Sequence, residues 1–409
     1  MRIAVFAPDI PYPPISGGRA DIWRRILALR ALGHQVMLVN LYEPAGRLAP
    51  LAQDLAAVDG VVTARFSFPM RRSRWRTLQQ LAMAWHTPWH VANRVPDADE
   101  QPRLCAQLDA FAPDVLWLDG PWFGREVLAQ LARRPSRLAY RSHNIEHRYL
   151  RGQAAAALRL RDRLAWRMAC WGVARFERLL MNRADAVFDI SVDDLAFWRN
   201  QGVQRLHWLP PLPELAVSAP PQQVVAGELV FVGNLGTPNN VRGVQFLLCE
   251  VLPLVRAQRP HTAVAIVGSN PTPAVKDWVA QSVGVTLHAN VAAPMQHLFG
   301  ARVLVNPVMT GSGVQVKMLD MLMTDCPIVT TTQGTRGLPP DMAALLHVAD
   351  TAQAFADAVC HALAQGTVDT AARALARRQF GVEGVRLALL QLAGPAAANP
   401  AAMSAGVAP

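Results

Sequence analysis

The sequence predicts an α/β protein built from two doubly wound domains, each with a parallel sheet. Short apolar runs bounded by glycine or proline recur along the chain, which is typical of strands buried on both faces. Segments with helical periodicity separate these runs. A proline-rich stretch with little periodicity interrupts the alternation at residues 213–227. Two series of strand–helix alternation on either side of a linker indicate two domains.

The first series opens with an apolar run at residues 2–8, a proline-rich loop and a helical pattern at 20–32. A second apolar run follows at 35–42. Strand, loop, helix and strand in this order form a right-handed βαβ unit. The series continues with a long helical region at 146–183 and with strands predicted at 114–119, 137–142, 186–191 and 206–209.

The second series begins with a strand at 228–233, followed by a helical pattern at 239–258. Its remaining strands are predicted at 263–268, 285–288, 303–307, 327–331 and 345–348. The predicted division is a first domain (1–212), a linker (213–227), a second domain (228–393) and a disordered tail (394–409). The last helix of the second domain could pack against the first domain. Ligands of doubly wound sheets bind beyond the carboxyl ends of the strands, so we expect the two domains to face a central cleft.

The composition is that of a folded protein with a substantial core, since 51% of the residues are hydrophobic and 17% are charged. The net charge of +10 is compatible with a solvated basic surface, phosphate-bearing ligands or an anionic membrane face. The arginines are spread along the whole chain, which disfavours nucleic acid. Five widely spaced cysteines indicate neither a disulfide framework nor a zinc site. No apolar run reaches the length of a membrane span, so we expect a cytoplasmic protein, at most peripheral to the membrane.

Polar or glycine-rich residues follow two strands of the first domain. Gly17 and Gly18 precede the helix at 20–32, and a glycine-rich helix start offers backbone N–H groups to an anion; a tight turn without a ligand is the alternative. The GxGxxG fingerprint is absent, which argues against a nicotinamide or flavin enzyme. His143 follows the strand at 137–142, and its imidazole can exchange protons near neutral pH. His147 is predicted to be a helix-surface or capping residue.

The segment after the strand at 303–307 carries the most informative pattern. Gly311 and Gly313 clear space around a predicted helix start, where Ser312 can cap the helix or bond a phosphate. Lys317 adds a positive charge, and Asp320 on the same face can accept hydrogen bonds from a ribose. The alternative is an ordinary capped helix with a Lys317–Asp320 ion pair on its surface.

A similar loop follows the strand at 228–233. Asn234, Asn240 and Arg242 lie in or just after it and can meet phosphate oxygens. A helix cap made by Asn239 would explain part of this pattern without any ligand.

Taken together, these motifs resemble the large retaining glycosyltransferase group often called group 1, or family 4, of the GT-B fold. The resemblance spans roughly residues 1 to 390, and it is strongest from Gly311 to Thr331. The first glutamate of the family's paired-glutamate motif is replaced by Ser312 here, and the second by Asp320. A subset that resembles exopolysaccharide sugar transferases shares this glycine–lysine pattern without the first glutamate. The other motifs that carry the resemblance are Gly17-Gly18, Leu32-Gly33-His34-Gln35-Val36, Arg141-Ser142-His143-Asn144-Ile145-Glu146, Ala184-Asp185-Ala186-Val187-Phe188 and Phe231-Val232-Gly233.

The resemblance implies an enzyme that binds a nucleotide sugar mainly with its second domain and the acceptor with its first. His143 looks like the family's active-site histidine, and Asp320 like the acid that holds the ribose. Gly17 and Gly18 look like the loop that touches the donor diphosphate. The donor site would be completed by Asn234, Arg242, Ser312, Gly313 and Lys317.

We therefore expect a retaining hexosyltransferase that acts in surface polysaccharide or glycoconjugate synthesis. Its partners would be a nucleotide-sugar donor and a glycan or lipid-linked acceptor, and no nucleic acid is expected. The arginines at 71–76 could contact an anionic membrane surface; the alternative is a solvated basic turn before a helix at 78–85. No paired-acid metal motif lies near a phosphate loop, so the sequence requires no metal and no cofactor beyond the substrate. The alternatives are a catalytically weakened nucleotide-sugar-binding protein and a nucleotide-sugar epimerase on the same fold.

Overall fold

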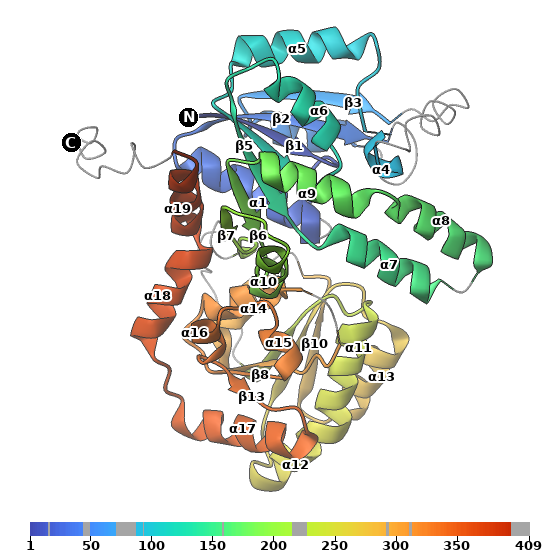
Figure 1. Ribbon diagram of the computed structural model, residues 1–409. Coiled ribbons are helices and arrows are strands. Elements are labelled where there is room, and N and C mark those ends of the chain that lie inside the picture. Colours follow the sequence, from blue (N-terminus) through green and yellow to red (C-terminus); the bar gives the residue numbers. More distant parts are fainter. Residues whose placement is uncertain are drawn as a thin grey trace, which may run out of the picture. The chain divides into compact units, whose positions relative to one another are not determined.

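The computed structural model describes residues 1–14, 17–43, 50–70, 87–92, 94–157, 159–214, 227–291, 294–310 and 313–393. The chain forms two compact units, each built around its own parallel sheet (Figure 1). Unit 1 comprises residues 1–190 and 194–209, together with the described residues from Gly384 onward. Unit 2 comprises residues 191–193 and 210–383.

Unit 1 contains a seven-stranded sheet with the order β3-β2-β1-β4-β5-β6-β7. All of its strand pairs are parallel, as expected for strands joined by helices. The inner strands β1, β4 and β6 are mostly apolar and almost entirely buried, as expected where helices cover both faces of such a sheet. The strands are β1 (Arg2–Ala7), β2 (Gln35–Tyr42), β3 (Ala64–Pro69), β4 (Val115–Asp119), β5 (Arg137–Ser142), β6 (Ala186–Asp189) and β7 (Leu206–Trp208).

Both long helical segments predicted in unit 1 differ in detail from the structure, and α2, α4, α5 and α6 were not predicted. The first helix begins at Gly17, three residues before the predicted start, so both glycines belong to it. The helical region at 146–183 is divided into three helices. The helices are α1 (Gly17–Ala31), α2 (Ala52–Asp59), α4 (Trp89–Ala92), α5 (Glu100–Phe111), α6 (Gly124–Leu131), α7 (Glu146–Ala156), α8 (Leu160–Cys170), α9 (Val173–Arg183) and α10 (Val192–Asn200).

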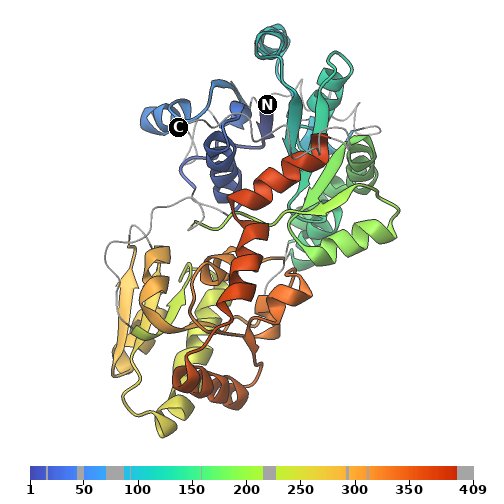
Figure 2. The same cartoon turned by 90° about the vertical axis from the view of Figure 1, so that its left-hand side faces the viewer.

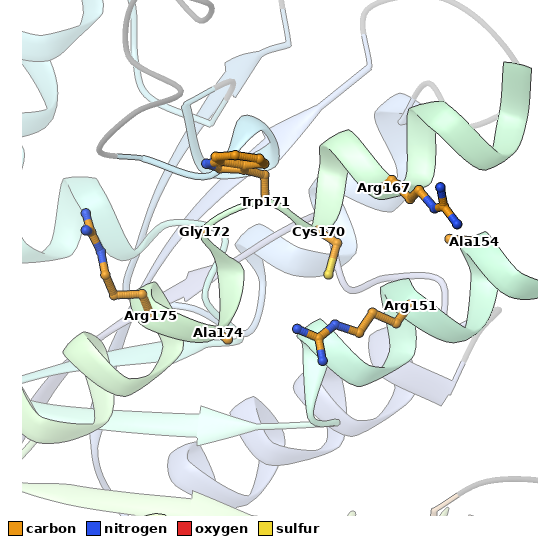
Figure 3. Close-up of a pocket in the computed structure, with 8 residues that line it drawn as sticks. All are labelled: Arg151, Ala154, Arg167, Cys170, Trp171, Gly172, Ala174 and Arg175. Atoms are coloured by element: carbon orange, nitrogen blue, oxygen red, sulfur yellow. The ribbon is translucent and has the colours of Figure 1, made fainter.

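Helices α7, α8 and α9 border an open hollow of about 540 Å³ (Figure 3). Gly172 separates α8 from α9 and has a φ of 74°, a left-handed conformation that glycine adopts at little cost. Helix α9 runs on from the end of α8 through this turn, and α7 lies alongside α8 (Figures 1 and 3).

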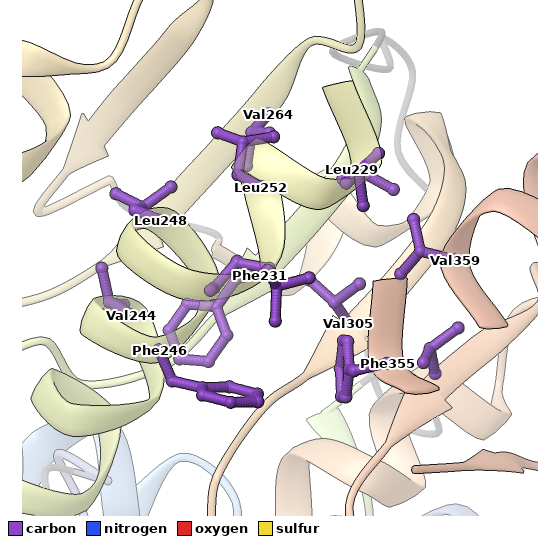
Figure 4. Packing of buried hydrophobic residues seen from close by; sticks show 14 of the residues in the cluster. Leu229, Phe231, Val244, Phe246, Leu248, Leu252, Val264, Val305, Phe355 and Val359 are labelled. Carbon is purple, nitrogen blue, oxygen red and sulfur yellow. The ribbon is translucent and has the colours of Figure 1, made fainter. Parts of the chain in front are cut away.

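Unit 2 contains a six-stranded parallel sheet with the order β10-β9-β8-β11-β12-β13. Its core is formed by aliphatic and aromatic side chains from the strands and from the helices that pack on them, including Phe231, Phe246 and Phe355 (Figure 4). The strands are β8 (Gly227–Val232), β9 (Val264–Gly268), β10 (Val285–Ala289), β11 (Ala301–Asn306), β12 (Ile328–Thr330) and β13 (His347–Val348).

The helix predicted at 239–258 is interrupted by a π-helical segment, η2 (Phe246–Val251). It separates α11 (Pro238–Gln245) from α12 (Leu252–Gln258). Pro253 has no N–H to donate to the carbonyl four residues earlier, and the wider turn accommodates that missing bond. The remaining helices are α13 (Pro273–Gln281), η3 (Pro294–Gly300), α14 (Val316–Leu322), α15 (Thr332–Thr335), α16 (Pro340–Ala343) and α17 (Ala352–Gln365), then α18 (Thr370–Phe380) and α19 (Val382–Ala393), which are red in Figure 2.

Candidate functional site

The strand order of unit 2 reverses between β8 and β11, and the most polar loops of the unit lie there. Neighbouring connections leave a doubly wound sheet in opposite directions at such a switch point, which opens a crevice beyond the carboxyl ends of the strands. The loop after β8 contains Asn234, and the chain after β11 leads to Gly313 and α14. The structure therefore brings together two loops that the sequence analysis singled out separately.

The loop after β8 is held in one conformation by its own hydrogen bonds. The Asn234 side chain accepts from the Gly236 N–H at 3.0 Å, and the Asn234 carbonyl accepts from the Asn240 amide at 2.9 Å. A Cβ at Gly233 would lie 2.9 Å from that same amide nitrogen, so a larger residue would displace the Asn240 side chain. Both asparagines thus shape the loop before any ligand arrives.

Lys317 is the central residue of this region. Its ammonium donates to Asn240 Oδ1 at 3.0 Å and lies 4.5 Å from the centre of the Phe231 ring. Burial lowers the pKa of Lys317 to about 7. Within the described part of the chain, Lys317 makes no ion pair, so its positive charge lacks a carboxylate partner. A half-buried cation with amide and aromatic neighbours favours the binding of an anion.

Arg242 adds a second cation to the same region. It lies on α11 with its side chain exposed, and it donates to the Thr310 hydroxyl at 3.2 Å. This contact joins the helix after β8 to the chain after β11, across the switch point. Two cations beside a set of backbone turns are suited to phosphate oxygens.

The helix that carries Lys317 begins later than the sequence predicted. It starts at Val316 with Gln315 as its N-cap, so Lys317 lies in its first turn. Gly313 lies outside it, with a φ of 67° and open space around its Cβ position. Asp320 is 1% exposed, so the alternative of a surface Lys317–Asp320 ion pair is wrong. Ser312 lies outside the described residues.

Unit 1 has its own switch point between β1 and β4, and His143 lies beside it. His143 Nε2 is 3.0 Å from Asp119 Oδ1 at the end of β4, and Nδ1 is 3.6 Å from Asp21 Oδ2 on α1. The imidazole is 20% exposed, whereas both carboxylates are buried. His143 is therefore held by buried acids while part of its ring remains accessible.

Two buried arginines balance these carboxylates. Arg141 donates to Asp21 through Nη2 at 2.7 Å, and Arg25 does so at 2.7 Å from one turn along α1. Burial would raise the pKa of Asp21, but the two guanidinium groups outweigh it and hold that pKa well below its usual range. The carboxylate of Asp21 therefore stays ionised beside His143. The sequence analysis missed Asp21, Asp119 and Arg25, because their role depends on contacts between distant segments.

Gly17 and Gly18 form the exposed start of α1. A Cβ at either position would have no described atom within 4 Å. Packing of the described chain thus does not explain the glycines. Free space around exposed N–H groups is compatible with the predicted contact to an anion.

A further acidic cluster lies at the start of α7. Glu177 accepts from the backbone N–H of Glu146 at 2.8 Å and from the His147 ring at 2.7 Å. Burial and the charge of Glu177 raise the pKa of Glu146 to about 7. His147 is 8% exposed, so the prediction that it lies on a helix surface is wrong.

A small hollow of about 240 Å³ lies at the carboxyl ends of β1 and β2, lined by Asp9, Tyr42, Glu43 and Arg94 among others. Arg94 is half-buried, and the loss of solvent around its guanidinium lowers its pKa to about 10. Within the described ranges, no group of three or more histidine, cysteine or acidic side chains could hold a metal ion. No helix of those ranges is long and apolar enough to cross a membrane.

Comparison with known proteins finds a family match in unit 2. The family model described as "Glycosyl transferases group 1" matches residues 226–365, which cover the switch point of unit 2. An uncharacterized 44.6 kDa protein in the cps region of Klebsiella pneumoniae is 26% identical over 117 residues. That match spans 27% of this chain and 30% of the relative.

Solved structures match nearly the whole chain. A sucrose-phosphate synthase from Thermosynechococcus elongatus is 14% identical, with a TM-score of 0.59 over 96% of this chain and 98% of that one. HepE of Anabaena, solved in complex with UDP, is 13% identical, with a TM-score of 0.60 over 96% and 99%. TarM of S. aureus, whose complex contains UDP, is 9% identical, with a TM-score of 0.59 over 96% and 99%. Residues 226–365 thus match the group 1 glycosyl transferase model, and the chain as a whole has the GT-B fold of these structures.

Proposed function

We propose that this chain is a retaining glycosyltransferase that moves a hexose-type sugar from a nucleotide-diphosphate donor. The acceptor is a glycan, lipid-linked or small molecule in the synthesis of a surface polysaccharide or glycoconjugate. The observation that carries the proposal is the half-buried ammonium of Lys317, which lies at the switch point of a group 1 glycosyl transferase domain with an amide partner instead of an acid. The complexes of HepE with UDP and UDP-glucose support a donor of this kind.

In this proposal unit 2 holds the donor. Lys317 and Arg242 bind the diphosphate, with the loop at Asn234 and Gly313 supplying backbone donors. As the glycosidic bond breaks, negative charge grows on the leaving diphosphate, and cations fixed in advance stabilise that charge. Asp320 stays a predicted ribose contact, and Ser312 a predicted phosphate contact.

Unit 1 serves the sugar or the acceptor. His143 offers a part-exposed imidazole whose orientation is fixed by Asp119, and Gly17 and Gly18 offer a second contact for the donor phosphates. Cations take the place of a metal, so turnover is expected to persist in EDTA. We place the protein in the cytoplasm at the inner membrane face, where a lipid-linked acceptor would be available.

Calorimetry and a donor-turnover assay test this function. UDP and GDP, with their hexose conjugates, are titrated into the wild-type protein and the Lys317→Ala variant. We expect one nucleotide to bind and the variant to lose at least about an order of magnitude in turnover without losing its fold. Binding without any turnover, even with acceptor extract, would indicate a binding protein instead. A converted sugar nucleotide in the absence of acceptor would indicate an epimerase.

A further inference from the structure

Helix α8 exposes a stripe of large apolar side chains. Leu160, Leu164, Met168 and Trp171 follow one another at intervals of four, four and three residues, so they lie on one face of the helix and the turn after it. Their exposed fractions are 69%, 50%, 58% and 65%. A contiguous apolar face of this kind is rare on a soluble surface and indicates an interaction site.

The surroundings of this stripe are strongly basic. The three acids of the segment 146–183 do little to offset the charge: Glu146 and Glu177 are buried, and Asp162 lies 3.6 Å from Arg161. The exposed arginines of the segment are Arg148, Arg151, Arg159, Arg161, Arg163, Arg167, Arg175, Arg178 and Arg183. A partner that complements this face must therefore present both an apolar region and negative charge.

Three of these arginines surround the hollow at the end of α8. Arg151 comes from α7, Arg167 from α8 and Arg175 from α9, with Trp171 at the turn between the last two (Figure 3). Trp171, the last member of the apolar stripe, lines this open hollow of about 540 Å³. Guanidinium groups beside an exposed indole suit the level of phosphate headgroups, where tryptophan is enriched.

We propose that the α8 face, defined as Leu160, Leu164, Met168, Trp171 and the arginines around them, docks this protein on an anionic lipid bilayer. A helix with an apolar stripe flanked by arginines lies in the plane of a membrane interface, with the apolar side chains below the headgroups. A second copy of the chain fits less well, because a two-fold contact would set arginines against arginines. Each arginine near an anionic surface strengthens binding by about fivefold.

This inference adds a partner to the proposed function, and its test uses no sugar nucleotide, so each can fail without the other. The full chain is floated with phosphatidylcholine vesicles and with vesicles of equal parts phosphatidylcholine and phosphatidylglycerol. We expect binding to the anionic vesicles alone, weakening as salt is raised. The variant Arg151→Gln/Arg167→Gln/Arg175→Gln should bind about a hundredfold more weakly. The variant Leu164→Ser/Met168→Ser should lose the part of the vesicle binding that persists at high salt, because that part comes from the apolar side chains.

Matched controls change exposed residues elsewhere. Arg103→Gln/Arg133→Gln/Arg378→Gln removes the same charge, and Leu51→Ser/Leu375→Ser the same apolar groups. Circular dichroism confirms that each variant folds. The proposal is overturned if the wild type binds neither vesicle or both equally, or if the controls lose as much binding as the test variants. It is also overturned if sedimentation shows a dimer that Leu164→Ser/Met168→Ser converts to a monomer.

Discussion

The unusual state of Lys317 predicts that nucleotide binding depends on pH. Burial lowers the pKa of this lysine to about 7, so in the free protein it is about half charged at pH 7 and about 1% charged at pH 9. A bound diphosphate would restore the charge. Because only the charged form binds well, the Kd for UDP should rise about fiftyfold from pH 7 to pH 9.

Two substitutions isolate the lysine as the source of this effect. Lys317→Arg keeps a charge at all these pH values and should bind with a nearly constant Kd. Lys317→Met should bind weakly, also with a constant Kd. Calorimetry in buffers with different ionisation enthalpies should report uptake of about one proton by the wild type at pH 9. A wild-type Kd that does not change over this range, or an equal slope in Lys317→Met, would refute the reasoning.

The remaining predictions concern stability and turnover. Glu146 has a pKa of about 7 in the folded protein, above the ordinary value of 4.5, so its ionisation costs stability as pH rises from about 4.5 to 7. Glu146→Gln should therefore stabilise the protein at pH 8 by roughly 2 to 3 kcal/mol in urea unfolding, and much less below pH 5. Asp119→Asn should leave UDP binding unchanged, lower turnover by about 10- to 100-fold and shift its pH profile, because His143 loses the acid that orients it. A merely structural role for Asp119 would lower stability without moving the profile. Gly17→Ala/Gly18→Ala should keep the melting temperature within a few degrees, since no described atom meets the new methyl groups, yet weaken donor binding; unaltered binding would remove this loop from the site.

Local patterns predicted the sheets well. Predicted strands such as 35–42 and 137–142 coincide with β2 and β5, because a strand buried on both faces is visible as a short apolar run. Strand β3 was not predicted, since its sequence Ala64–Pro69 mixes arginine and serine with aromatics at the edge of the sheet. The division of 146–183 into three helices was also missed, because the whole stretch has uniform helical composition.

The sequence indicated which loops form the candidate site, but it did not indicate which side chains of those loops contact one another. Glycine-rich loops after strands indicated where ligands bind, since the carboxyl ends of parallel strands share one edge. The contact of Lys317 with Asn240 joins residues 77 positions apart, and that of His143 with Asp119 joins residues 24 apart. Neither contact can be predicted from local sequence periodicity, because each joins separate elements of the fold. The membrane contact predicted at 71–76 lies outside the described residues.

The hydrogen-bond partner of Lys317 is a neutral amide, which determines whether the positive charge of the lysine stays available to a ligand. Asn240 uses its amide nitrogen to fasten the loop at Asn234 and its oxygen to steady the ammonium. An aspartate in the same place would satisfy the lysine fully and repel an arriving phosphate. The neutral amide of Asn240 does neither. It orients the ammonium of Lys317 without neutralising it, so the positive charge remains available to an anionic ligand.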